Sequence, residues 1–114
     1  AKTSKLFQSE DYLHHFDEPE IAYAFARIEC HYFINGGFFE TDEWLLENVD
    51  KVKHLPTVII QGRYDLVCPM VSAWELYRAL PQANFEVIKD AGHSMTEEGI
   101  ASKLVEYTDK FSKF

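Results

Sequence analysis

The stretch Pro56-Thr57-Val58-Ile59-Ile60-Gln61-Gly62 decides how the chain folds. It is a short, nearly continuous apolar run rich in β-branched residues, and it lies between a proline and a glycine. A strand buried on both faces has this composition, and such strands are typical of parallel sheets. We therefore expect a buried strand over 57–60 that belongs to a parallel sheet.

The residues after this strand continue with a helix, a second strand and a second helix. Residues 70–80 show apolar positions at helical spacing and stop before Pro81, residues 84–88 form a strand pattern, and 96–113 form the last helix. This order predicts an α/β fold with parallel strands and right-handed crossovers. Two parallel strands are too few for a sheet covered on both faces, so we expect the edge of a larger sheet whose other strands are missing.

The first part of the chain is expected to be helical. Asp17 can cap a helix over 19–33, whose apolar residues form one stripe and which Gly36-Gly37 ends. A shorter helix is expected over 42–53, whereas residues 1–17 show no clean period.

Charge is divided unevenly along the 114 residues. The net charge of −8 lies entirely in residues 1–50, while 51–114 are neutral. A pI near 5.0 without a basic cluster argues against a nucleic-acid partner, because phosphates are neutralised by Lys and Arg. No apolar run approaches the roughly 18 residues of a membrane span, so we expect no membrane partner.

The cysteines and the chain start bear on location. Cys30 and Cys68 form no CxxC motif and are interpreted as reduced thiols, although one disulfide between them stays open. The start Ala1-Lys2-Thr3-Ser4-Lys5 lacks an initiator Met and an apolar core, so no signal peptide is expected. These features predict a cytoplasmic protein. The missing Met also suggests that the chain is part of a longer protein.

Two loops follow the predicted strands and carry the candidate chemistry. Functional groups of parallel α/β folds lie just beyond the carboxyl ends of the strands. Asp65 follows the first strand and His93 follows the second, which is the acid and base pair of a nucleophilic triad. In α/β-hydrolases the chain order is Ser, acid, His. No G-x-S-x-G elbow occurs here, so the nucleophile would lie upstream of Ala1.

Several segments resemble one peptidase family. The run ARIECHYF at 26–33 and the run NGGFF at 35–39 resemble the cap helix of proline iminopeptidases. The acid loop GRYDLVCP at 62–69 and the histidine loop GHS at 92–94 are similar to the loops of the same family. The match extends from about residue 19 to the last helix.

The resemblance implies a C-terminal part of an α/β-hydrolase. Residues 1–40 would be part of a helical cap domain, and 41–114 would be a parallel sheet edge with flanking helices. Asp65 would be the triad acid, His93 the base, and Glu29 a cap carboxylate that binds the free amine of a peptide with an N-terminal proline. No cofactor is implied, the missing upstream part would supply the serine, and the fragment alone would be inactive.

Other interpretations stay open for these residues. Asp65 could be a turn residue, His93 could cap the last helix, and Glu29 could be a solvated carboxylate. No metal site is expected, because adjacent histidines at 14–15 cannot face one ion and no metal-ligand spacing occurs. Cys68 is expected to be a small buried hydrophobe. Alternative functions are another cap-bearing hydrolase, such as an esterase or epoxide hydrolase, and a non-catalytic interaction fragment.

Overall fold

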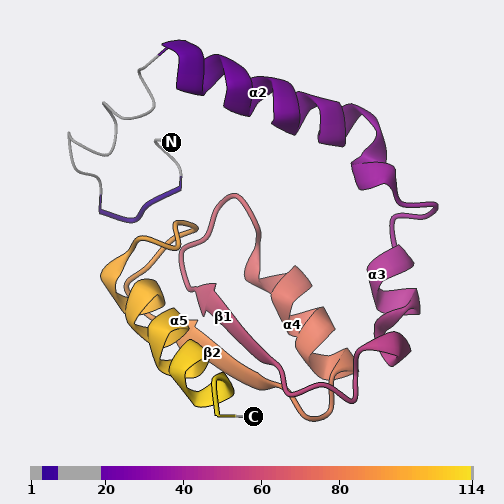
Figure 1. The fold of residues 1–114 in the computed structure, drawn as a ribbon, viewed down its shortest axis with the longest axis vertical. Coiled ribbons are helices and arrows are strands. Elements are labelled where there is room, and N and C mark those ends of the chain that lie inside the picture. Colours follow the sequence, from indigo (N-terminus) through magenta and orange to yellow (C-terminus); the bar gives the residue numbers. More distant parts are fainter. Residues whose placement is uncertain (1–3, 8–18, 114) are drawn as a thin grey trace.

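The structure is a computed structural model that describes residues 4–7 and 19–113. No helix in these described ranges has both the length and the apolar character needed to cross a membrane. The elements along the chain are shown in Figure 1; they are α2 (Pro19–Ile34), η1 (Gly36–Phe38), α3 (Trp44–Glu47), η2 (Val49–Lys51), β1 (Val58–Gly62), α4 (Met70–Ala79), β2 (Asn84–Ile88) and α5 (Glu98–Phe111).

The two strands form a parallel sheet. Their register runs from Val58 opposite Asn84 to Gly62 opposite Ile88, and α4 connects them. The predicted α/β class with parallel strands is therefore confirmed. A parallel pair needs a crossover between its strands, which is why the helical pattern lies between them in the sequence.

Helices cover opposite faces of the sheet, as the alternation of β2 side chains shows. The rings of Trp74 and Tyr77 on α4 lie 6.0 and 5.3 Å from the ring of Phe85. The next residue, Glu86, accepts a 2.6 Å hydrogen bond from the hydroxyl of Tyr107 on α5. Because successive side chains of a strand point to opposite faces, α4 and α5 pack on opposite sides.

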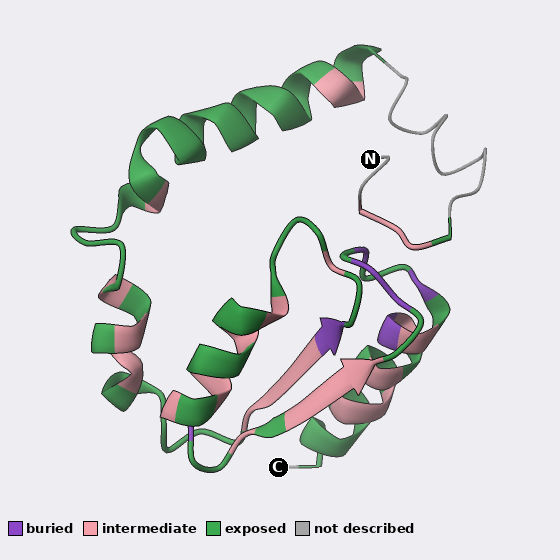
Figure 2. Cartoon of the chain, turned by 180° about the vertical axis from the view of Figure 1, so that it is seen from behind, coloured by how far each residue is buried: buried purple, intermediate pink, exposed green. Residues whose placement is uncertain are grey.

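Burial in the described ranges is confined to a few positions around the strand ends, as Figure 2 shows. The buried apolar residues are Leu80, Ala91 and Ile100. Residues 58–60 of β1 are only half-buried, so the expectation of a strand buried on both faces is wrong for this chain by itself. The physical reason is that a sheet of two strands with one helix on each face leaves its margins uncovered.

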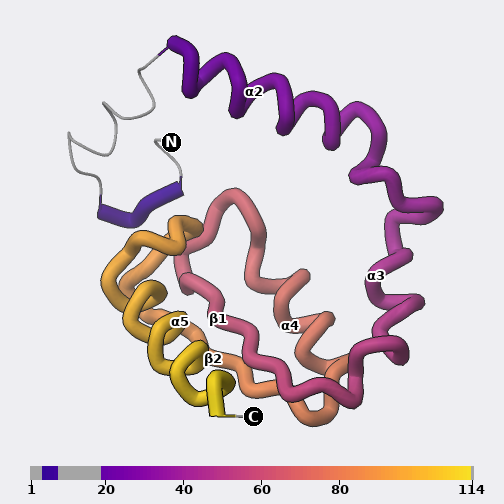
Figure 3. The backbone as a smooth tube through the Cα atoms, in the orientation of Figure 1, coloured from indigo at the N-terminus to yellow at the C-terminus, as the bar shows by residue number. Residues whose placement is uncertain are grey.

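The N-terminal helices follow a separate path. Figure 3 shows that the chain from α2 to α3 forms an arc around the α/β unit formed by 58–111. The predicted helix over 19–33 is confirmed and ends at Ile34, just before two glycines with positive φ of 55° and 63°. That conformation carries no steric cost for glycine, which lacks a Cβ atom.

The predicted helix over 42–53 is wrong as a single element. The structure divides it into α3 and η2, which meet at Asn48. The side-chain amide of Asn48 donates a 2.8 Å hydrogen bond to the carbonyl oxygen of Trp44. The backbone N–H of Asn48 donates to the same carbonyl at 3.1 Å, and the helix ends here because Asn48 has non-helical backbone angles, φ −106° and ψ 8°. Asparagine favours such helix ends, since its side chain can bond to nearby backbone groups.

Candidate active site

Asp65 lies in the loop that follows β1, and hydrogen bonds hold both of its carboxylate oxygens. Oδ1 accepts bonds from the backbone N–H groups of Val67 at 2.9 Å and Cys68 at 2.8 Å. Oδ2 accepts a 3.3 Å bond from the side-chain amide of Gln61 and lies 3.0 Å from Nδ1 of His93. The carboxylate is thus held in one orientation by its own loop and by the last residues of the strand.

The surroundings of Asp65 keep its carboxyl group ionised. Burial raises the pKa of Asp65, but hydrogen bonds from Cys68, His93 and Val67 and the charge of His93 lower it more. The net pKa of Asp65 lies below its ordinary value of 3.8. The group is therefore an acceptor at neutral pH, as the partner of an imidazole N–H must be.

Backbone hydrogen bonds join the acid loop to the histidine loop. The N–H of Arg63 donates to the carbonyl of Ile88, and the N–H of Tyr64 donates to the carbonyl of Ala91, each at 2.9 Å. These bonds extend the pairing of β1 and β2 beyond the strand ends. They explain why Asp65 and His93, 28 positions apart, come within hydrogen-bond distance.

Gly62 permits the closest contact between the two loops. A Cβ atom at this position would lie 1.8 Å from the carbonyl oxygen of Gly92 and 2.8 Å from that of Ala91. Real Cβ atoms essentially never come that close to other heavy atoms. The last residue of β1 must therefore lack a side chain for the loops to meet.

The two members of the pair differ in exposure. The side chain of Asp65 is 7% exposed, whereas that of His93 is 40% exposed. Among the described residues, Nε2 of His93 has no hydrogen-bond partner. The geometry therefore presents one imidazole nitrogen to the protein interior and leaves the other open to an incoming group, which suits proton transfer.

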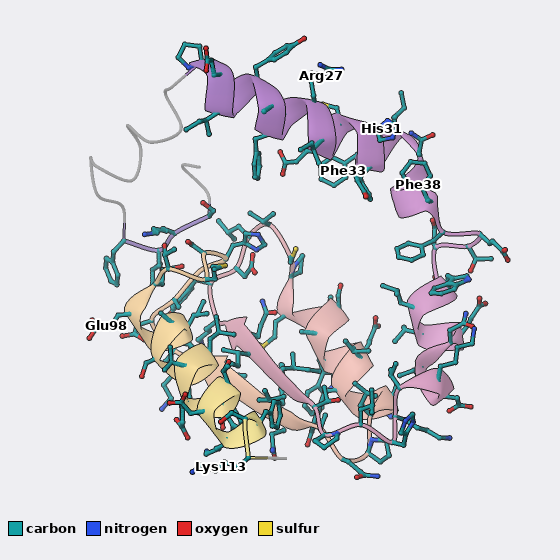
Figure 4. All side chains as sticks on the ribbon, in the orientation of Figure 1. Arg27, His31, Phe33, Phe38, Glu98 and Lys113 are labelled. Carbon is teal, nitrogen blue, oxygen red and sulfur yellow. The ribbon has the colours of Figure 1, made fainter. Side chains whose placement is uncertain are left out.

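The structure does not bring Glu29 to this pair. Glu29 lies on the exposed helix α2 and forms no hydrogen bond or ion pair with any described residue. Figure 4, in which Arg27 and His31 mark α2, shows this helix well apart from Glu98 at the start of α5. The role of Glu29 stays a prediction.

Two polar residues that were not predicted from the sequence support the pair. Gln61 is 9% exposed and donates to Asp65 and to the carbonyls of Gly62 and Cys68. Its signal was a polar residue at the end of an otherwise apolar strand. Glu97, also 9% exposed, accepts bonds from the backbone of the histidine loop, and its signal was a carboxylate just before the last helix.

Both cysteines are exposed in the structure, which contradicts the prediction for one of them. Cys68 is exposed on the acid loop, so the expectation that it is buried is wrong, because the loop projects beyond the sheet. Partial desolvation and the charge of Asp65 raise the pKa of Cys68 above its ordinary value. Cys30 and Cys68 are both free thiols. In the described ranges, no three Cys, His, Asp or Glu side chains are grouped to hold a metal ion.

An acid and a histidine at the carboxyl ends of adjacent parallel strands is the arrangement that α/β-hydrolases use in their triads. No family model matches the chain. The chain is 59% identical over 109 residues to a probable proline iminopeptidase of Leptolyngbya boryana, covering 96% of this chain and 34% of that protein. It is 52% identical over 94 residues to a proline iminopeptidase of Arabidopsis thaliana, covering 82% and 25%.

A third relative extends this pattern to another bacterium. The chain is 45% identical over 109 residues to a proline iminopeptidase of Xylella fastidiosa, covering 96% of this chain and 35% of that protein. The chain thus spans between a quarter and about a third of the length of these curated relatives and matches their C-terminal part. The resemblance expected from the motifs is confirmed: the chain is a homologue of proline iminopeptidases.

Proposed function

We propose that the chain is the C-terminal part of a serine aminopeptidase that releases N-terminal proline from peptides. The observation that carries the proposal is the 3.0 Å contact between Asp65 and His93, in a homologue of proline iminopeptidases. Residues 1–40 would form part of the helical cap, and 41–114 the C-terminal part of an α/β-hydrolase domain. We also propose a cytoplasmic location, because a reducing compartment keeps cysteines such as the two free thiols reduced.

The pair would act as the acid and base of the triad. The carboxylate of Asp65 would accept a hydrogen bond from Nδ1–H of His93, which fixes the tautomer that leaves Nε2 free. Nε2 would take the proton of an upstream serine hydroxyl as its oxygen attacks the carbonyl carbon of the N-terminal proline. His93 would return the proton to the departing peptide amine, and water would then release proline from the acyl-enzyme by the same steps.

Glu29 would recognise the amine of the substrate. The proposal rests on the resemblance of its helix and on the net charge of −8 in residues 1–50, which attracts a cation. A carboxylate makes charge-assisted hydrogen bonds to an ammonium group. Glu29 is exposed and forms no hydrogen bond or ion pair with a described residue, so a ligand need not displace an existing partner, but α2 would have to approach the acid and base pair for both to contact one substrate.

The test compares two forms of the protein. The full-length protein, meaning this chain with the upstream part that its relatives have, should hydrolyse a proline arylamide, and the 114-residue chain should not. Replacing His93 with Ala in the full-length protein should abolish turnover. Turnover by the 114 residues alone, or an upstream part without a G-x-S-x-G elbow, would contradict the proposal.

A second comparison separates an aminopeptidase from another cap-bearing hydrolase. In the full-length protein, Glu29→Gln should weaken hydrolysis of substrates with a free N-terminal amine and spare simple esters. The physical reason is that only the amine needs a negative charge for binding. Equal loss for both substrates would instead favour an esterase-like enzyme in which Glu29 has no role in recognition.

A further inference from the structure

We infer that Glu97 is a positioning residue, which holds His93 opposite Asp65 by binding the backbone of the histidine loop. The inference rests on the proposed function, since it concerns the same acid and base pair. Glu97 would act without touching the imidazole or the substrate. Its carboxylate instead fixes the peptide groups on both sides of His93.

The contacts of Glu97 define this role. Its Oε1 accepts hydrogen bonds from the backbone N–H groups of Gly92 at 2.9 Å and Ser94 at 3.3 Å. Its Oε2 accepts a 3.0 Å bond from the N–H of Leu6. The residues that donate to Oε1 immediately precede and follow His93, so one carboxylate oxygen spans the residue that carries the base.

The position of Glu97 in its helix makes these contacts notable. Glu97 is the N-cap residue of α5, yet its side chain makes no capping hydrogen bond to that helix. Carboxylates at N-caps ordinarily accept bonds from the first turn, because those N–H groups lack helical partners. This carboxylate is turned back onto the loop, where it remains near the positive end of the helix dipole.

Burial makes the arrangement specific. Glu97 is 9% exposed, and a buried carboxylate is costly unless hydrogen bonds compensate for lost water. The three backbone donors supply this compensation. Conversely, the amide groups of the histidine loop are themselves buried at Gly92 and Ser94 and need acceptors. Removing the carboxylate would therefore leave the N–H of Gly92 unsatisfied, and the N–H of Ser94 would keep only its bond to the carbonyl of Ser4.

The N-terminal segment completes the support of the loop. The carbonyl oxygen of Ser4 accepts bonds from the N–H groups of His93 at 2.8 Å and Ser94 at 2.7 Å. Because Leu6 binds Glu97, the segment 4–7 and the carboxylate hold the loop together. Every backbone N–H from Gly92 to Ser94 thus has a fixed partner, and His93 has little freedom to move away from Asp65.

Two substitutions separate loop positioning from general stability. Glu97→Gln keeps a side-chain oxygen that can accept from Gly92 and Ser94 but places an NH₂ group near the N–H of Leu6. Glu97→Ala removes all three bonds. Glu98→Ala is the matched control, because Glu98 is the exposed neighbour in the first turn of α5 and Figure 4 shows it pointing outward.

Kinetics of the full-length protein test the inference. We expect Glu97→Ala to lower kcat for a proline arylamide by about 10- to 100-fold with KM little changed, since small misplacements of a catalytic group have effects of this size. Glu97→Gln should restore most of kcat, and Glu98→Ala should match the parent. A purely structural role would lower the melting temperature without this rescue and without a split between kcat and KM.

Hydrogen exchange supplies a readout that needs no turnover. Peptides covering 92–94 should exchange faster in Glu97→Ala than in the parent or Glu98→Ala, and Glu97→Gln should protect them while exposing Leu6. If Glu97→Ala does not fold, Glu97→Gln is compared with the parent. Faster exchange at Leu6 with unchanged exchange at 92–94 would support the inference, and equal exchange at Leu6 would contradict it. Equal exchange and equal kcat in the Glu97 and Glu98 variants would overturn the inference. A parent without turnover but with these exchange changes would refute the proposed function alone.

Discussion

The closest backbone contact of the candidate site gives the sharpest prediction, for Gly62→Ala. The new Cβ atom would lie 1.8 Å from the carbonyl oxygen of Gly92, whereas ordinary carbon contacts lie at about 3.5 Å or more. The obstructing atom belongs to the backbone and cannot rotate aside. The histidine loop must therefore move by about 1.5 Å relative to β1 to accommodate one methyl group.

The magnitude follows from what this movement breaks. Overpacking costs about 1–3 kcal/mol in free energy of unfolding, and a rigid obstacle places Gly62→Ala at the upper end. Loss of the 2.9 Å bond from Tyr64 to Ala91 adds about 1 kcal/mol. The same movement would carry the 3.0 Å contact between Asp65 and His93 beyond hydrogen-bond range, and kcat should fall by roughly 100-fold.

The assay pairs thermal unfolding with turnover of a proline arylamide, both on the full-length protein. Gly99→Ala is the control, because its Cβ would meet a side-chain methyl of Ile88 at 2.5 Å rather than backbone. Ile88 can adjust its rotamer, and alanine favours the helix by about 1 kcal/mol, so the Gly99 variant should lose far less. Gly62→Ala with parental stability and kcat would refute the reasoning.

Three further outcomes test the acid loop in the full-length protein. Asp65→Asn should destabilise the full-length protein most at neutral pH, and the difference in unfolding free energy from the parent should shrink below about pH 4. The reason is that the hydrogen bonds that lower the pKa of Asp65 stabilise the fold only while its carboxyl group is ionised. Mass spectrometry should show slow alkylation of Cys68 at pH 7 and faster alkylation in Asp65→Asn. Equal rates in the two proteins would show that the charge of Asp65 does not raise the pKa of the thiol. Gln61→Leu should lower kcat more than it raises KM, and unchanged kinetics would show that Asp65 needs no side-chain donor.

Local patterns of apolar residues predicted most of the elements of the α/β unit. The apolar run before Gly62 predicted β1, and the helical spacing of apolar residues over 70–80 predicted α4. Such patterns arise because the positions that face a neighbouring element are apolar. The prediction of one helix over 42–53 failed because Asn48 has non-helical backbone angles, with its side chain bonded to the carbonyl of Trp44. That choice depends on conformation and has no periodic signal.

The topology of the sheet allowed only part of the candidate site to be predicted. Two loops that follow adjacent parallel strands must meet, so the proximity of Asp65 and His93 could be expected. The bonds of Glu97 could not, because one of its donors lies 91 positions away in the chain. Cys68 was misjudged because exposure of a loop residue depends on how far the loop projects from the sheet.

The bond between Leu6 and Glu97 also has a consequence for folding order. Joining positions 91 apart costs about 4 kcal/mol of loop-closure entropy, so this contact should form late, after the local helices and the strand pair. A partly folded chain would then hold both halves of its acid and base pair without the clasp that aligns them. One protease cut between Leu6 and Glu97 would place the two residues in separate chains, so their contact would then form between two molecules instead of within one.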